Sequence, residues 1–273
     1  GKSTTARLVM GLLQPTEGTV RFMGQNIFDL SREEMQKTRR KMQMVFQDPL
    51  AALNPAKTVR QIIIRPFKVH HAAGRDEIEG QVTELLRKVG LEPPEMFLNR
   101  YPHELSGGQR QRIVIARAIA LRPRFIAADE PVSALDMSVR AQILNLMKEL
   151  RNDLNLTYLF ITHDMAVLRS TCDRVAIMYL GKIVELAPVS DLFERPLHPY
   201  TQSLLLSVPL PRPRIAREKG IIALGGDVPS AIDPPSGCRF HTRCRIAKER
   251  CVVEEPDLLP VRNGHFVACW LAR

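Results

Sequence analysis

The sequence predicts an α/β protein whose core is a parallel sheet. Two short apolar runs, residues 125–128 and 158–161, have the length and composition of buried parallel strands, and helix-like stretches occupy residues 5–13 and 110–121. Polar side chains follow directly after both apolar runs. Because ligands of open α/β sheets bind at the carboxyl ends of the strands, these two places are candidate parts of a functional site.

The chain begins with Gly1, Lys2, Ser3 and Thr4, which match the end of the phosphate-binding pattern G-x-x-x-x-G-K-[ST]. In that pattern the lysine reaches the β- and γ-phosphates of a nucleotide, and the hydroxyl joins the Mg²⁺ shell. So short a match arises often by chance, but the helix-like run at residues 5–13 follows it as the pattern requires. Lys2 and Ser3 are therefore candidate ligands of a nucleotide and its Mg²⁺.

Asp129 and Glu130 follow the first apolar run. Asp129 is placed to hold Mg²⁺ through water, and Glu130 to orient or deprotonate an attacking water. The alternative interpretation is an Asp-Glu pair that caps the next helix, for which Pro131 is also suitable. His163 follows the second run and can contact a γ-phosphate from there, although a lone histidine is more often a hydrogen-bonded surface or core residue.

Ser106, Gly107 and Gly108 stand in front of the basic, helix-forming stretch at residues 110–121. A helix that begins there presents backbone N–H groups and a positive end to phosphate oxygens. Taken alone, Ser-Gly-Gly is a common turn. The surrounding motifs decide between the two interpretations.

In their order, these motifs resemble those of the ATP-binding subunits of ABC transporters. The matching segments are residues 1–4 (the end of Walker A), 45–49 with Gln47 (the Q-loop), 105–109 (the signature, ending in Gln109), 125–130 (Walker B), 133–136 with Asp136 (the D-loop), and His163 (the switch histidine). The resemblance implies a P-loop NTPase fold with a parallel core sheet, an antiparallel β subdomain and a helical subdomain. It also implies ATP and Mg²⁺ as cofactors.

The same resemblance implies a head-to-tail dimer in which each ATP lies between the Walker motifs of one subunit and the signature of the other. The chain's own nucleotide would contact Gly1, Lys2, Ser3, Thr4, Gln47 and Asp129, whereas Ser106, Gly107, Gly108 and Gln109 would contact the nucleotide of the partner. Asp136 would be a further nucleotide-site residue. Ser3, Gln47 and Asp129 would hold Mg²⁺, and Glu130, His163 and Gln47 would be catalytic.

One departure from the family pattern lies at the start of the chain. The first strand, an adenine-stacking aromatic residue and the opening glycine of Walker A are expected before Gly1. We therefore expect the sequence to be truncated within Walker A, and we expect the 273-residue chain to bind ATP poorly.

Composition and charge restrict the remaining function classes. The formal net charge is +10, with basic clusters at residues 39–41 and 212–219, but acids or prolines interrupt both clusters and aromatic residues make up only 5% of the chain. We therefore expect no nucleic acid as a partner. The apolar runs are also shorter than the roughly 18 residues that a membrane-spanning helix needs.

The domain organisation is predicted as a nucleotide-binding domain at residues 1–205, followed by a small domain at residues 206–273. Residues 18–24 alternate and turn like an edge hairpin strand. Apolar residues at 78, 82, 85, 86 and 89 share one helical face, and residues from about 50 to 118 are expected to be mainly helical. The proline-rich segment 208–213 predicts a stiff, extended connector.

The small domain contains four of the five cysteines, Cys238, Cys244, Cys251 and Cys269. Their spacing lacks the C-x₂₋₄-C knuckles typical of zinc sites, and four thiolates can equally hold an iron–sulfur cluster or remain unligated. The fifth, Cys172, is expected to be a small buried apolar residue.

Short segments of the tail narrow the family. Several short segments resemble those of the ATPases of oligopeptide and dipeptide importers. In the tail they are residues 229–230, 234–235, 237–240, 243–244 and 265–269, and earlier in the chain they are 46–49, 53–55 and 198–201. Some members of that branch carry a 4Fe–4S cluster, which the resemblance assigns to the four cysteines. Arg245 stands where a proline commonly follows the second cysteine.

The predicted function is that of the ATP-hydrolysing subunit of a bacterial peptide importer. Its partners would be a second ATPase subunit, identical or related, two transmembrane permease subunits and, indirectly, a substrate-binding protein. It would lie on the cytoplasmic face of the plasma membrane. The alternatives are the same importer type with nickel or glutathione as cargo, and a soluble ABC ATPase that acts on nucleic acid or the ribosome.

Overall fold

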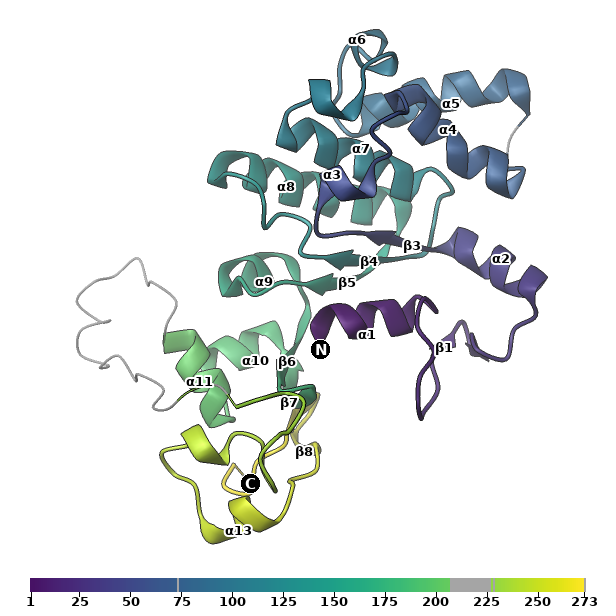
Figure 1. Ribbon diagram of the computed structural model, residues 1–273. Coiled ribbons are helices and arrows are strands. Elements are labelled where there is room, and N and C mark those ends of the chain that lie inside the picture. The colour runs from purple at the N-terminus through teal and green to yellow at the C-terminus, as the bar shows by residue number, and fades with distance from the viewer. Residues whose placement is uncertain (73, 207–226, 228, 273) are drawn as a thin grey trace. The chain divides into compact units, whose positions relative to one another are not determined.

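The computed structural model describes residues 1–72, 74–206, 227 and 229–272 (Figure 1). The chain divides into two compact units, one formed by residues 3–163 and the other by residues 1–2 together with the chain from residue 164 onward. The predicted connector at residues 208–213 and the basic cluster at 212–219 lie outside the described residues. No helix among the residues described is long and apolar enough to span a bilayer.

A parallel sheet forms the centre of the unit that contains residues 3–163. Its strands β3 (Met42–Val45), β4 (Phe125–Asp129) and β5 (Thr157–Ile161) are arranged with β4 in the middle. Val45 pairs with Ala128, and Asp129 pairs with Ile161, so the three strands end at the same edge of the sheet. The α/β fold with a parallel core sheet is therefore confirmed.

Helix α1 (Lys2–Val9) packs against this sheet. The shared core consists of Ala6, Met10, Met42, Met44, Ala127 and Ile161. The chain then forms a small antiparallel hairpin, β1 (Arg21–Phe22) and β2 (Gln25–Asn26), before helix α2 (Arg32–Lys41). Residues 18–24 thus contain the first strand and the turn of a hairpin, in which Met23 and Gly24 have positive φ angles, and the second strand follows at residues 25–26.

Helices make up most of the chain between β3 and β4. They are α3 (Pro49–Ala52), α4 (Val59–His70), α5 (Arg75–Lys88), α6 (Glu95–Leu98), the 3₁₀ turn η1 (Pro102–Glu104) and α7 (Gly107–Ile119). The apolar face predicted near residue 80 is buried at Ile78, Val82 and Leu86. Helix α8 (Met137–Leu154) follows β4 and lies beside α7 (Figure 1).

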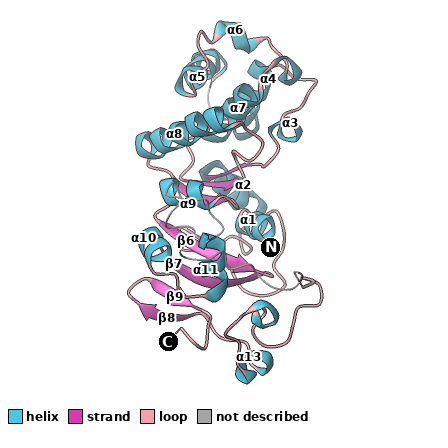
Figure 2. Cartoon of the chain, turned by 90° about the vertical axis from the view of Figure 1, so that its left-hand side faces the viewer, coloured by secondary structure: helices cyan, strands magenta, loops and turns pink. Residues whose placement is uncertain are grey.

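An antiparallel sheet forms the centre of the other unit (Figure 2). Its strand order is β6 (Arg174–Tyr179), β7 (Lys182–Pro188), β9 (His265–Val267) and β8 (Leu259–Arg262). The helical elements of this unit are α9 (Met165–Thr171), α10 (Val189–Glu194), α11 (Pro199–Leu206), η2 (His241–Arg243) and α13 (Glu249–Val253). Residues on both sides of the predicted boundary at 205/206 therefore share one sheet.

One core joins the early and late parts of this unit. The rings of Tyr179, Tyr200 and Phe240 lie 4.7–5.4 Å apart between centroids, in tilted or edge-to-face arrangements. Val175, Ile177 and Leu192 complete the buried cluster with the partly buried Cys172. Cys172 therefore packs with apolar neighbours as the sequence predicts, but it is only partly buried.

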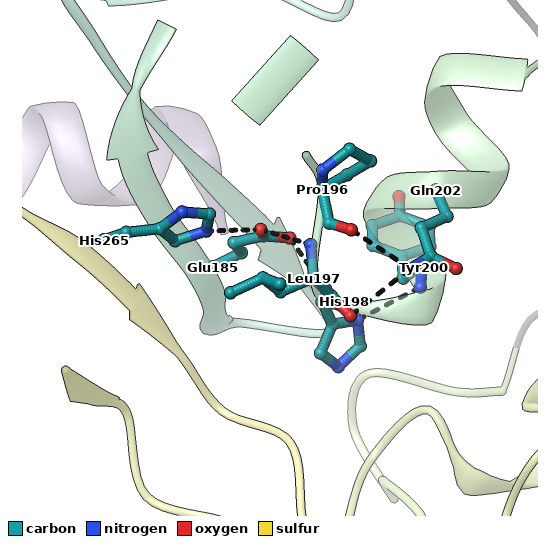
Figure 3. Close-up of polar contacts among 7 residues, drawn as sticks. All are labelled: Glu185, Pro196, Leu197, His198, Tyr200, Gln202 and His265. Carbon is teal, nitrogen blue, oxygen red and sulfur yellow. Dashed lines mark hydrogen bonds and ion pairs between the residues drawn. The ribbon is translucent and has the colours of Figure 1, made fainter. Parts of the chain in front are cut away.

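The carboxylate of Glu185 on β7 is fully buried and binds three donors (Figure 3). The backbone N–H groups of Leu197 and His198 donate to it at 2.8 and 3.0 Å, and Nε2 of His265 on β9 lies 2.7 Å away. These contacts of Glu185 connect three segments: β7, the residues just before α11, and β9. A buried carboxylate with this many partners is costly to disrupt, because removal of one partner leaves buried polar groups unsatisfied.

Glu185→Ala should lower the free energy of unfolding of this unit by about 3–5 kcal/mol, because His265 and two N–H groups would lose their acceptor. Denaturant titration measures the change. The matched control is Glu254→Ala, which removes the exposed partner of Arg250 at 2.8 Å and should cost less than about 1 kcal/mol. Equal effects of the two substitutions would show that Glu185 has no special structural role.

The buried His198 predicts a pH dependence of stability. Burial lowers the pKa of His198 to about 4, although the nearby Glu185 opposes the shift. Its Nδ1 accepts a hydrogen bond from the N–H of Tyr200, so the native ring is neutral. Above pH 6.5 the ring is neutral in both folded and unfolded chains, whereas between pH 6.5 and about 4 only the unfolded chain gains the proton.

Stability should therefore fall by up to about 3 kcal/mol as the pH decreases across this range. His198→Asn, which keeps an acceptor for Tyr200 but does not titrate, should remove that part of the pH dependence. Denaturant titrations at several pH values test the expectation. An unchanged profile in the variant would contradict it.

Candidate functional site

The end of strand β4 carries a buried carboxylate next to a hydroxyl. Asp129 is only 5% exposed, and Oγ of Ser3 on α1 donates to its Oδ1 at 3.1 Å. Hard oxygen donors of this kind fit Mg²⁺, which prefers carboxylates and hydroxyls and keeps part of its water shell. The two residues therefore form a suitable pair for the predicted metal.

Glu130 follows in a backbone conformation that is unusual for a residue with a side chain. Its φ angle is +46°, in the left-handed region. The turn is held because the N–H of Glu130 donates to the carbonyl of Ile161 on β5, and its own carbonyl accepts from the Ser133 hydroxyl at 3.1 Å. Such strain is typical of sites where the direction of a side chain matters.

Both carboxylate oxygens of Glu130 contact a side chain that follows a neighbouring strand. Nε2 of Gln47 donates to Oε2 at 3.2 Å, and Nδ1 of His163 lies 3.1 Å from Oε1. The side chain of Glu130 is 17% exposed and that of His163 is 69% exposed. The structure thus brings together the three residues for which the sequence predicts catalytic roles.

The predicted signature residues lie at the start of α7. Ser106 is the N-cap: its Oγ accepts from the N–H of Gln109 at 3.3 Å, while its own N–H donates to Oε1 of Gln109 at 3.0 Å. This reciprocal pair satisfies two N–H groups at the helix end. Gly107 and Gly108 form the first turn, where backbone N–H groups have no partner within the helix.

Asp136 caps helix α8 in a similar way. Its Oδ1 accepts from the N–H of Val139 at 2.9 Å and from the Ser138 hydroxyl at 2.7 Å. The hydrogen bond from Val139, followed by that from Ser138, lowers the pKa of Asp136. Asp136 is thus the cap of α8. The sequence motif predicts it only as a residue of the nucleotide site and does not predict this structural role.

The remaining predicted phosphate-loop residues lie at the start of the chain. Gly1 and Lys2 belong to the other compact unit. Thr4 is exposed on α1.

A cavity of about 740 Å³ adjoins Ser3, Gln47 and Asp129. Its other lining residues include the cations Arg7, Arg39 and Arg117 and the apolar Met10, Met42, Met44, Ala51 and Ala52. Arg117 donates to the carbonyl of Ala52 at 2.6 Å, and burial, with the repulsion of Arg65, lowers its pKa.

These three arginines were not predicted to lie at the site, although Arg39 belongs to the basic cluster at residues 39–41. Arg7 could have been found, because it lies four residues after Ser3 and so shares its helical face. The basic cluster that contains Arg39 does not by itself indicate this cavity, and no sequence pattern places Arg117 there.

The four C-terminal cysteines are free thiols, with Cys251 and Cys269 buried. Burial raises the pKa of Cys238, Cys244 and Cys269, with a further contribution from neighbouring thiols. Across the residues that the structure describes, no group of three or more His, Cys, Asp or Glu side chains could hold a metal ion. The observed arrangement therefore does not fit a cluster.

The fold and the arrangement at β4 define an ATP-binding cassette ATPase, and comparison with known proteins agrees. Residues 1–133 match the model of the ABC transporter family, and residues 184–251 match the C-terminal region of oligopeptide/dipeptide transporters. A dimeric ATP-binding cassette in a post-hydrolysis state, bound to ADP and Pi, is 34% identical with a TM-score of 0.62, over 69% of this chain and 81% of that chain. A cassette from Clostridium perfringens, part of an ABC transporter complex, is 29% identical with a TM-score of 0.65, over 80% of this chain and 82% of that chain.

Comparison with curated relatives shows to which group of ATP-binding cassette ATPases the chain belongs. An oligopeptide transport ATP-binding protein of Bacillus subtilis is 54% identical over 272 residues, which cover 99% of this chain and 82% of the relative. A probable peptide ABC transporter ATP-binding protein of Sinorhizobium fredii is 51% identical over 269 residues, 98% of this chain and 75% of the relative. The chain belongs to the family of ATP-binding subunits of oligopeptide/dipeptide ABC transporters.

Proposed function

We propose that this chain hydrolyses ATP to power peptide uptake through an ABC importer. The observation that carries the proposal is the carboxylate of Glu130, held between Gln47 and His163 beside the Ser3–Asp129 pair. Relatives named as oligopeptide transport and peptide import ATP-binding proteins support the same activity and the same cargo class. They do not favour the alternative of an ATPase that acts on nucleic acid.

The site residues divide into a metal-binding group and a water-activating group. Ser3 and Asp129 would hold Mg²⁺, with the side-chain oxygen of Gln47 as a further ligand, and the bound ion would neutralise charge on the phosphates. Lys2 would reach the β- and γ-phosphates. Glu130 would orient the attacking water and accept its proton, while His163 would contact the γ-phosphate.

The signature residues support a shared site. Ser106, Gly107, Gly108 and Gln109 form the N-terminal end of a 13-residue helix, which suits an anion, but Glu130 lies elsewhere, after β4. In the proposed dimer, this helix end would bind the nucleotide held by the partner ATPase. Asp136, at the start of α8, would lie at the same subunit boundary.

We further infer that two permease subunits carry the peptide and that this chain binds them from the cytoplasmic side of the bacterial plasma membrane. Two exposed apolar side chains flank the Q-loop: Phe46 is 38% exposed and Leu50 is 51% exposed. They would provide contacts that link Gln47 to a membrane subunit. The cargo would not touch this chain, so its choice among peptides, nickel or glutathione would rest with the permeases and a binding protein.

The 4Fe–4S cluster stays a prediction that rests on the resemblance of the tail alone. We expect any cluster to require rearrangement of Cys238, Cys244, Cys251 and Cys269 from their observed positions. Iron and sulfide in equal amounts after anaerobic purification would establish it. Iron-free, colourless protein would remove the cluster from the account without affecting the ATPase proposal.

Glu130→Gln in the assembled transporter should lower ATP turnover by about 10²–10⁴-fold, because the amide cannot accept the proton from water. Nucleotide binding and the contacts to Gln47 should persist, since Gln has the same shape as Glu. Turnover, ATP binding and peptide uptake into vesicles are the measurements. The control Glu149→Gln changes an exposed residue of α8 and should leave all three unchanged; undiminished turnover in Glu130→Gln would remove Glu130 from its role.

A further inference from the structure

Helices α7 and α8 contact each other from their first turns onward. A Cβ atom added at Gly107 would lie 3.5 Å from Cδ2 of Leu135, the residue before the cap of α8. One turn further, Nη2 of Arg112 donates to Oε1 of Gln142 at 3.3 Å. Because contacts advance in the same direction along both chains, the two helices run parallel and begin side by side.

Val139 fills the space beside Gly108. A Cβ atom at Gly108 would lie only 2.6 Å from Cγ1 of Val139, closer than real carbon atoms approach. A larger residue at position 108 would therefore force Val139 or the first turn of α7 to shift, before any nucleotide is considered.

Val139 has little freedom to move away. Its N–H donates to Oδ1 of Asp136 at 2.9 Å, which fixes its backbone in the cap of α8. Its branched side chain has one strongly preferred rotamer in a helix. The two restraints favour one position of the isopropyl group beside the first turn of α7.

We propose that Val139 is a positioning residue for ATP hydrolysis. It sets the position of Gly107 and Gly108 relative to Asp136. It thereby places the N-terminal end of α7 so that this end can bind the phosphates of the partner's nucleotide. The inference rests on the proposed function, because it gives the signature glycines their role at a shared site. Beyond that function, the shape of the side chain at position 139 controls how well the signature glycines bind the partner's nucleotide.

Glycine at position 108 can be explained in two ways, which predict different results. If only close approach to a phosphate requires glycine, a methyl group at 108 is harmful whatever stands at 139. If Val139 sets the position of the turn, the harm comes from displacement of α7, and a smaller residue at 139 should relieve it. Misplacement of about 1 Å can reduce a rate on the order of 10²-fold.

The experiment compares Gly108→Ala, Val139→Ala and the double variant with the unchanged protein in the assembled transporter, with kcat and KM for ATP as readouts. Gly108→Ala should lower kcat/KM by about 10–100-fold and Val139→Ala by only about 2–5-fold, and the double variant should recover to within about 2-fold of Val139→Ala. Val139→Thr keeps the branched shape and should retain kcat/KM. Val253→Ala, a change at a residue of α13 that is 77% exposed, is the control for nonspecific effects.

A double variant as inactive as Gly108→Ala would overturn the proposal. If Gly108→Ala does not fold, as judged by thermal unfolding, Val139→Ala and Val139→Thr decide: the first must lower kcat/KM and the second must not. Absence of ATPase activity in the unchanged transporter would instead overturn the proposed function, and with it this inference.

Discussion

The parallel pairing of β4 with its two neighbours is the constraint on which the candidate site depends. The register ends all three strands at one edge of the sheet. Gln47, Glu130 and His163 lie only one or two residues beyond those ends, so short segments suffice to bring them together. A slip of one residue in either pairing would exchange the faces of a whole strand and separate the Glu130 carboxylate from one of its contacts.

Two carboxylates in this chain illustrate how the surroundings of a group suit it to different tasks. Glu185 is fully buried and accepts from two backbone N–H groups, which cannot rotate away. Glu130 is partly exposed, and its contacts come from two side chains that follow strand ends. Side chains can exchange partners when a ligand binds, so the Glu130 arrangement suits a reacting group, whereas Glu185 suits a permanent connection between strands.

Much of the fold and site was predictable because short motifs carry their own geometry. An apolar run with polar residues after it indicated β4, and the Ser-Gly-Gly sequence indicated the start of α7. The left-handed backbone of Glu130 was not predictable, because it depends on the hydrogen bond from its N–H to Ile161, which is distant in sequence. The pairing of β9 with β7 escaped for the same reason: residues about 80 positions apart meet there, and local patterns do not report such contacts.

The cap of α8 shows how one residue can serve both architecture and function. Asp136 holds the N–H of Val139, Val139 rests against Gly108, and Gly108 belongs to the helix end proposed to bind the partner's nucleotide. Helix α7 also contacts α8 through Arg112 and Gln142, so the two helix starts pack against each other. Displacement of either start is therefore passed to the other, because close-packed side chains transmit strain instead of absorbing it. The signature and the D-loop would thus reach the neighbouring subunit together, so the cap of α8 would influence hydrolysis through the position of the signature residues.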